Sequence, residues 1–175
     1  MNRTLSARLA YAVVAASITF VGSATQSIAA APPPPADVVV IDLPAGTACK
    51  SFDLHVEIRN NPNRVMREFK DRKGNVVRVL TAGKGNTLVF TNVETNEKVT
   101  LSPSGSVEHI TLNRDGSQTW AVTGHNVLIL FPTDVPAGPS TTLYVGRLVF
   151  TVDAKGVFTV QSASGTSTDI CATLE

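Results

Sequence analysis

The chain has 175 residues, 43% of them hydrophobic and 17% charged, a composition that indicates one globular domain and excludes a disordered or fibrous protein. The 15 Lys and Arg residues nearly balance the 14 Asp and Glu residues, so the totals give no electrostatic footprint for nucleic acid or anionic lipid.

The N-terminus has the pattern of a secretory signal peptide, which we assign to residues 1–30. Arg3 and Arg8 form a positive region, and the uncharged run Leu9 to Val21 is shorter than the ~20 residues that span a bilayer. Small residues predict cleavage near Ala29 or Ala30; the alternative is a retained N-terminal anchor. Cleavage removes two arginines and no acids, which leaves 13 basic residues against 14 acidic ones.

Residues 31–48 are expected to form a proline-rich spacer. The four prolines Pro32 to Pro35 favour an extended polyproline II conformation. Asp37 to Leu43 then predicts an edge strand or an ordered arm, and Pro44 and Gly46 end it.

Residues 49–175 are predicted to form a single all-β domain that begins at Cys49. Phe52, Leu54, Val56 and Ile58 alternate with polar residues, as in a strand with one buried face. Asn126 to Phe131 is apolar on both faces and predicts a central strand. The other predicted strands are 65–71, 76–81, 87–93, 98–102, 107–113, 118–123, 143–152 and 157–161, and a polar run follows at 162–168.

Short polar turns join most of these strands, and hairpin-linked strands lie side by side. We therefore predict an antiparallel meander of about ten strands that forms a barrel or a flattened barrel. The alternative is a Greek-key β-sandwich. No segment has a sustained helical apolar stripe, so little helix is expected.

Cys49 and Cys171 are the two cysteines of an exported chain, and we predict a disulfide between them. The alternative is two free thiols. In a closed meander this bond would join the first and last strands, and the chain-entropy model gives about 5 kcal/mol for so long a loop.

Catalytic and metal motifs are absent from the sequence. No Gly-x-Ser-x-Gly elbow occurs, and Gly83 to Asn86 predicts a hairpin turn rather than a phosphate loop. Asp53, His55 and Glu57 share one strand face and are the candidate set for a metal or acid–base site. A solvated strand face is the ordinary interpretation, so neither a metal nor a cofactor is predicted.

A ligand is expected, if anywhere, near the long irregular connection Pro132 to Thr142. The competing interpretation is that this connection only joins two strands. For Trp120, packing in the core is the favoured interpretation over stacking on a ligand. The candidate ligand-binding residues are Trp120, Phe131, Asp134 and Tyr144.

Several short motifs together resemble a known group of proteins. They are Cys49-Lys50-x-Phe52-Asp53, Phe90-Thr91-Asn92, Leu128-x-Leu130-Phe131-Pro132-x-Asp134, Gly146-Arg147 and Asp169-x-Cys171. In these motifs the chain is similar to the small secreted β-domain proteins of actinobacteria that carry a terminal pair of cysteines. The resemblance implies export, a β-rich fold and a terminal disulfide, and it supplies no activity or catalytic residue.

The function predicted from the sequence is that of a secreted, non-enzymatic β-domain in the extracellular space. It would bind a small apolar molecule or a partner protein, with no nucleic acid and no membrane after signal cleavage. The alternatives are a barrel-type enzyme of the isomerase or cyclase kind and a structural cell-envelope interaction protein.

Overall fold

The computed structural model describes residues 38–102 and 104–175, so the predicted signal peptide and most of the predicted spacer lie outside the described residues. The described chain is all-β, as predicted, with ten strands and one short helix, α1 (Ile170–Thr173). In these two ranges no helix is long and apolar enough to cross a membrane. The strands are β1 (Val38–Leu43), β2 (Leu54–Arg59), β3 (Arg64–Lys70), β4 (Val76–Lys84), β5 (Thr87–Asn92), β6 (Lys98–Leu101), β7 (Gly105–Leu112), β8 (Gln118–Leu130), β9 (Ser140–Val152) and β10 (Phe158–Asp169).

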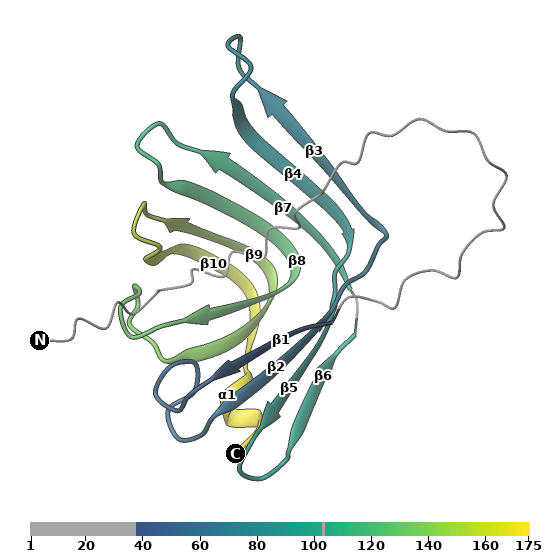
Figure 1. Ribbon diagram of the computed structural model, residues 1–175, viewed down its shortest axis with the longest axis vertical. Coiled ribbons are helices and arrows are strands. Elements are labelled where there is room, and N and C mark those ends of the chain that lie inside the picture. The colour runs from purple at the N-terminus through teal and green to yellow at the C-terminus, as the bar shows by residue number, and fades with distance from the viewer. Residues whose placement is uncertain (1–37, 103) are drawn as a thin grey trace, which may run out of the picture. The chain divides into compact units, whose positions relative to one another are not determined.

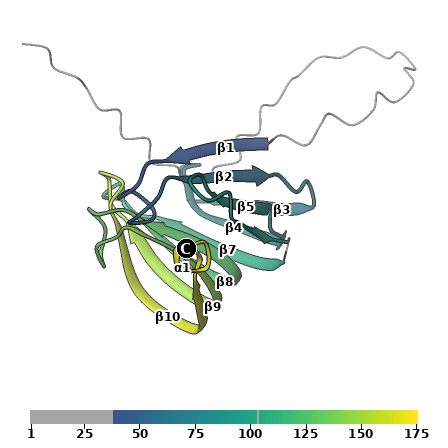
Figure 2. The same ribbon diagram turned by 90° about the horizontal axis from the view of Figure 1, so that it is seen from below.

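The strands form two antiparallel sheets (Figure 1). Sheet A has the order β1-β2-β5-β6, and sheet B has the order β10-β9-β8-β7-β4-β3. Short connections lead from β2 to β3, from β4 to β5 and from β6 to β7, so three stretches of chain pass from one sheet to the other. Seen from below, β1, β2 and β5 of sheet A lie at one side, and β4, β7, β8, β9 and β10 of sheet B follow one another away from them (Figure 2).

Three hairpin turns share one geometry, and the sequence predicted all three. The turns follow β3, β7 and β9. In each, the backbone N–H of a glycine donates to the carbonyl of the residue three positions earlier, at 3.0–3.2 Å. The glycines have positive φ, which costs glycine little. The pairs are Gly74 with Asp71, Gly116 with Asn113 and Gly156 with Asp153.

A row of small residues crosses sheet B where β8, β9 and β10 bend (Figure 1). Its glycines have φ between 91° and 144°, a region that other residues rarely adopt. A Cβ at Gly124 would collide with the backbone oxygen of Gly105, and one at Gly146 with that of Ser164. Neighbouring strands therefore approach closely here. This glycine row consists, in cross-strand order, of Gly83, Ser106, Gly124, Gly146 and Gly165.

The first hydrophobic core, core 1, is built from β2 and β5 of sheet A, from the segment that leads into β2 and from the C-terminal residues. Val127, Ile129 and Leu143, from β8 and β9, pack against it, so strands of both sheets share this core. Its buried residues are Ala48, Cys49, Phe52, Leu54, Val56, Ile58, Phe90, Ile170 and Leu174.

Core 2 is built from residues of β8, β9 and β10 alone. Trp120 and Val122, on one side of Gly124, and Leu128 and Leu130, on the other, belong to the same cluster, so β8 packs against itself. The odd-numbered residues beyond the bend face core 1, as predicted for a central strand. Core 2 is built from Val122, Leu128, Leu130, Leu148 and Phe150, with Trp120, Tyr144, Val152, Phe158 and Val160 packed against them.

The predicted disulfide is confirmed, with 5.6 Å between the Cα atoms of Cys49 and Cys171. It joins the entry of β2 to α1, directly after β10. The described strands nevertheless form no closed barrel, because β1 and β6 remain the edges of sheet A, and β3 and β10 those of sheet B. The disulfide therefore links segments of two separate sheets.

Three local predictions were wrong. Gly83 to Asn86 is no hairpin turn, because β4 pairs with β3 and β7 whereas β5 pairs with β2 and β6. The predicted strands 118–123 and 126–131 are one strand, β8, because Gly124 continues the ladder at positive φ. The last strand, predicted to end at residue 161, continues through the polar run 162–168 to Asp169, because ladder bonds to β9 form regardless of side-chain polarity.

Candidate functional site

Two of the four predicted ligand-binding residues lie in core 2. The Trp120 ring stacks on Phe150 with 5.6 Å between the ring centroids, and its indole N–H donates to Gln118 Oε1 at 2.9 Å. Tyr144 packs against the same cluster. The structure thus brings Trp120 and Tyr144 together in an apolar setting where the tryptophan is already stacked and hydrogen-bonded.

The other two, Phe131 and Asp134, lie in the connection between β8 and β9. The Asp134 side chain accepts the backbone N–H of Phe131 at 2.6 Å and that of Phe158 at 2.9 Å. Asp134 is only 4% exposed. Both carboxylate oxygens therefore bind backbone N–H groups, one in the loop and one at the start of β10, so Asp134 stabilises the loop.

The same connection is bound to the start of β10. The backbone N–H of Val135 donates to Phe158 at 2.8 Å, and Val160 donates back to Val135 at 2.7 Å. Val135 and Thr159 form a parallel bridge. This ladder of contacts favours the interpretation of the loop as a connector over that of a free binding rim.

Among the hollows at the surface of the described chain, two are formed outside the cores. The larger, of about 400 Å³, is open and shallow and lies along the glycine row, where Lys84, Val107 and Thr123 line it. The smaller, of about 120 Å³, lies beside the disulfide.

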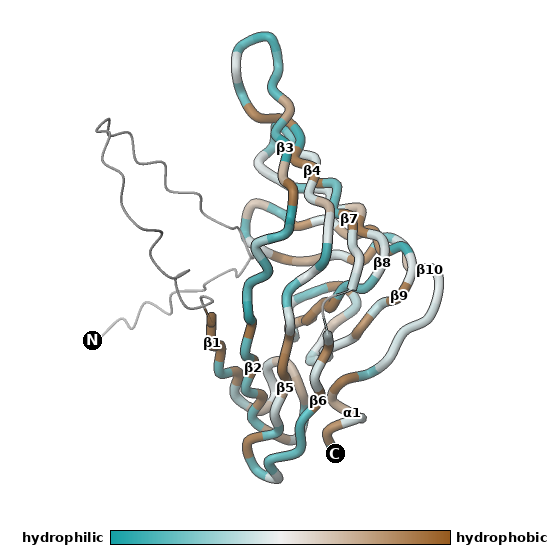
Figure 3. Tube along the Cα trace, turned by 90° about the vertical axis from the view of Figure 1, so that its right-hand side faces the viewer, coloured by the Kyte–Doolittle hydropathy of each residue, from teal (hydrophilic) through white to brown (hydrophobic). Residues whose placement is uncertain are grey.

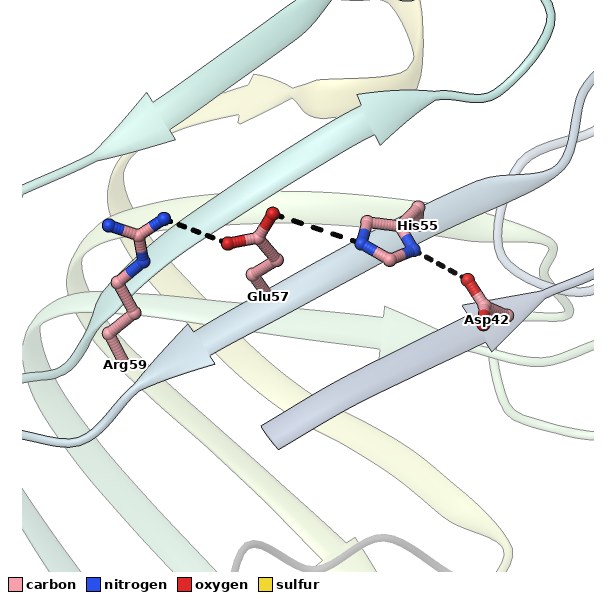
Figure 4. A network of polar contacts seen from close by, with 4 residues as sticks. All are labelled: Asp42, His55, Glu57 and Arg59. Carbon is pink, nitrogen blue, oxygen red and sulfur yellow. Dashed lines mark hydrogen bonds and ion pairs between the residues drawn. The ribbon is translucent and has the colours of Figure 1, made fainter. Parts of the chain in front are cut away.

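A chain of polar contacts runs across β1 and β2 on the surface of sheet A (Figure 4). His55 Nδ1 lies 2.6 Å from Asp42 Oδ1, and its Nε2 lies 3.9 Å from Glu57 Oε1. Arg59 donates to Glu57 Oε2 at 2.9 Å, and this hydrogen bond holds the pKa of Glu57 below its ordinary value. The network fastens the edge strand β1 to β2.

The predicted trio of Asp53, His55 and Glu57 is only partly brought together. Asp53 lies before β2 and accepts the backbone N–H of Ala45 at 2.7 Å, while Asp42 of β1 takes its place beside His55. Within residues 38–102 and 104–175, no three His, Cys, Asp or Glu side chains are grouped as a metal ion requires.

The outer face of sheet B, which we define as the side opposite core 2, carries exposed apolar residues. Val65 is 61% exposed, Val107 42% and Phe69 39%. Val65 and Val107 belong to one cross-strand row through Ala82. The hairpin of β3 and β4 that carries much of this surface reaches beyond the neighbouring strands (Figures 1 and 3).

The acidic residues in the strands of sheet B all lie on one of its two faces. The strands of this sheet contain three acidic residues, Glu68, Glu108 and Asp169, and the register places all three on the side of core 2. Glu108 pairs there with Arg64 at 2.7 Å. The outer face instead carries four exposed basic residues, namely Arg67, Arg78, Lys84 and Arg147.

Comparisons with known proteins add no assignment: the chain matches no protein-family model, no curated protein and no solved structure.

Sequence reasoning missed the outer face for an identifiable reason. Arg64 to Arg78 alternates in sign along the chain, and this alternation indicates a solvated hairpin with mixed charge. In a strand, alternate residues point to opposite faces, so neighbouring Arg67 and Glu68 lie on opposite faces of the sheet. The alternation of residues within β3 could have been used to find its outward-facing side chains. The cross-strand register was needed to show which residues of β7 and β9 share that face.

Proposed function

We propose that this chain is a secreted, non-enzymatic β-domain that binds a partner protein through the outer face of sheet B. The carrying observation is that Val65, Phe69 and Val107 are exposed on the outer face of β3 and β7, whereas the apolar side chains of core 1 and of core 2 are buried within each core. Apolar residues grouped on a surface are typical of interaction sites. Val65, Phe69 and Val107 are the central contacts of the proposed site.

A small apolar ligand is the weaker of the two predicted occupants. Ligand pockets are usually concave cavities of roughly 300–1,000 Å³ that enclose the bound molecule. The hollow along the glycine row has a comparable volume but is shallow and open, and core 2 is filled by aromatic and aliphatic side chains. An enzyme would need polar groups converging in a cavity, whereas the His55 network lies on the surface of a sheet.

We also infer that sheet A and the strand ends of β8 and β9 form two layers around core 1, in the manner of a flattened barrel or sandwich. Residues of both sheets in one core support this inference. The resemblance to small secreted actinobacterial β-domain proteins is retained as part of the same proposal.

Export is the remaining part of the proposal, and the Cys49–Cys171 bond is compatible with an oxidising compartment. N-terminal sequencing of the protein from culture medium should find a first residue of Ala30 or Ala31. A mature chain that still begins at Met1 would contradict cleavage.

Site-specific photo-crosslinking tests partner binding. A benzoylphenylalanine residue replaces Val65 in the secreted chain, and the control chain carries it at Thr100, an exposed position of β6 in sheet A. We expect one discrete protein adduct from position 65 in the extracellular fraction and none from position 100. Equal adducts from both positions, or a stoichiometric apolar molecule in native mass spectra of the purified chain, would contradict the proposal.

A further inference from the structure

We propose that the segment of the partner that docks on the outer face of sheet B is acidic and extended, with apolar side chains between its carboxylates. This inference rests on the proposed function and specifies the chemistry of the partner. It follows from the charges, the apolar contacts and the composition of the rest of the chain.

The charges on the outer face indicate that the docking segment of the partner is negatively charged. Arg67, Arg78, Lys84 and Arg147 are exposed on the outer face, and no Asp or Glu of the described sheet B strands shares that face. Single exposed ion pairs contribute little, but a surface of one sign attracts and orients an oppositely charged partner. The formal charge of the whole chain, +1, conceals this local excess.

The apolar side chains provide anchors between these charges. Arg78 lies over the ring of Phe69 at 4.9 Å, so one guanidinium is held beside an exposed aromatic ring. Val65, Ala82 and Val107 form a second cross-strand row of the same face, four residues earlier along β3, with Arg67 between the two rows. A partner that places apolar side chains on this row and carboxylates near Arg67 and Arg78 would satisfy both kinds of contact.

Two occupants from this chain fit the surface less well. The segment 1–37 contains a single acid, Asp37, and so lacks complementary charge. A second copy would present the same basic face, which repels itself in a symmetric pairing of that patch.

Peptide binding by the purified, oxidised chain tests the inference. The probe is a fluorescein-labelled dodecapeptide of alternating Glu and Val, with alternating Lys and Val as its control, and fluorescence anisotropy gives Kd. We expect the acidic peptide to bind and its Kd to rise about tenfold when salt increases from about 0.02 M to about 0.3 M, because screening shortens the Debye length. Failure of the acidic peptide to bind, or equal binding of both peptides, would overturn the inference.

Charge reversal localises the site. Arg67→Glu combined with Arg78→Glu should raise Kd about tenfold or more, and Lys84→Glu combined with Arg147→Glu serves as a second pair should the first fail to fold. Lys155→Glu, in the turn after β9, reverses one charge away from the outer face and should leave Kd within about twofold. An equal loss of binding in the Lys155 variant and in the folded charge-reversal pair would overturn the assignment to this face.

The remaining outcomes separate this inference from the proposed function. Binding of phosphatidylglycerol vesicles without binding of the acidic peptide would overturn an acidic protein segment in favour of a lipid surface. A salt-sensitive dimer of the chain alone, seen by sedimentation and abolished by Arg67→Glu with Arg78→Glu, would overturn it in favour of self-association. A crosslink at position 65 that persists in the charge-reversal variant would leave partner binding intact and reject its acidic chemistry.

Discussion

At the scale of single residues, the role of Asp134 shows how burial converts an acid into a structural element. Its carboxylate is nearly inaccessible and accepts two backbone N–H groups, one from its own loop and one from β10. Asp134→Ala should lower the free energy of unfolding by about 2–4 kcal/mol, because both donors lose a charged acceptor in a buried setting. Urea denaturation followed by tryptophan fluorescence measures the loss.

Two further variants sharpen this expectation. Asp134→Asn keeps one acceptor oxygen and should fall between the wild type and Asp134→Ala. Thr133→Ala changes the exposed neighbour in the same loop and should remain within about 0.5 kcal/mol of the wild type. If Asp134→Ala were as stable as Thr133→Ala, the bonds to Phe131 and Phe158 would not be holding the loop.

The same residue shows a limit of prediction from sequence. An acid in a long proline-containing loop indicates function, and nothing in the sequence shows that Phe158, 24 positions away, places its N–H beside it. The pairing of Cys49 with Cys171 was predictable because a chain with two cysteines allows one intrachain pair. Many backbone N–H groups could have been hydrogen-bond donors to Asp134, and only the folded structure shows that Phe131 and Phe158 supply them.

At the scale of elements, the glycine row determines where sheet B bends. Gly124→Ala should destabilise the chain by more than about 2 kcal/mol, because it combines a strained positive φ with a Cβ placed against the backbone of Gly105. Gly105→Ala is the matched control, since its Cβ meets nothing within 4 Å. Thermal unfolding of both variants compares them, and equal midpoints would show that the row does not require glycine.

Turns were predicted well because their signals are local. Asp71, Asn113 and Asp153 each begin a polar turn that has glycine at its fourth position, and this short pattern specifies the backbone without reference to the rest of the chain. Gly83 to Asn86 has a similar composition, yet the chain passes there from sheet B to sheet A. Some glycines turn the chain, and others lie within a continuous strand that bends. The difference depends on pairing with distant strands, which the local sequence pattern does not reveal.

At the scale of the whole described chain, two cores share the strands β8 and β9. Core 1 receives residues from sheet A, from α1 and from β8 and β9, whereas core 2 is confined to the bent strands β8–β10 and the residues that they fold together. The disulfide belongs to core 1, since Cys49 is 1% exposed and lies among its residues. The two cores should therefore respond differently when the disulfide is removed.

Replacement of both Cys49 and Cys171 by alanine tests this difference. The bond closes a loop with a sequence separation of 122, and its loss should cost about 2–5 kcal/mol of unfolding free energy, mainly through the greater freedom of the unfolded chain. Ser51→Ala is the matched control, because it removes the hydrogen bond of 2.8 Å from Ser51 Oγ to Glu175 Oε1, which joins the same two segments without a covalent bond. This exposed bond should contribute about 1 kcal/mol or less.

Hydrogen exchange then locates the effect of the cysteine replacement within the molecule. Amides of β2 and β5, whose side chains fill core 1, should be accelerated more in the double alanine variant than those of residues 118–123 of β8 and 147–152 of β9, whose apolar side chains belong to core 2 alone. A uniform acceleration over both cores would mean that they open as one unit and that the disulfide stabilises the entire chain equally. If the urea midpoint of the double alanine variant equalled that of the wild type, the disulfide would not be a principal source of stability.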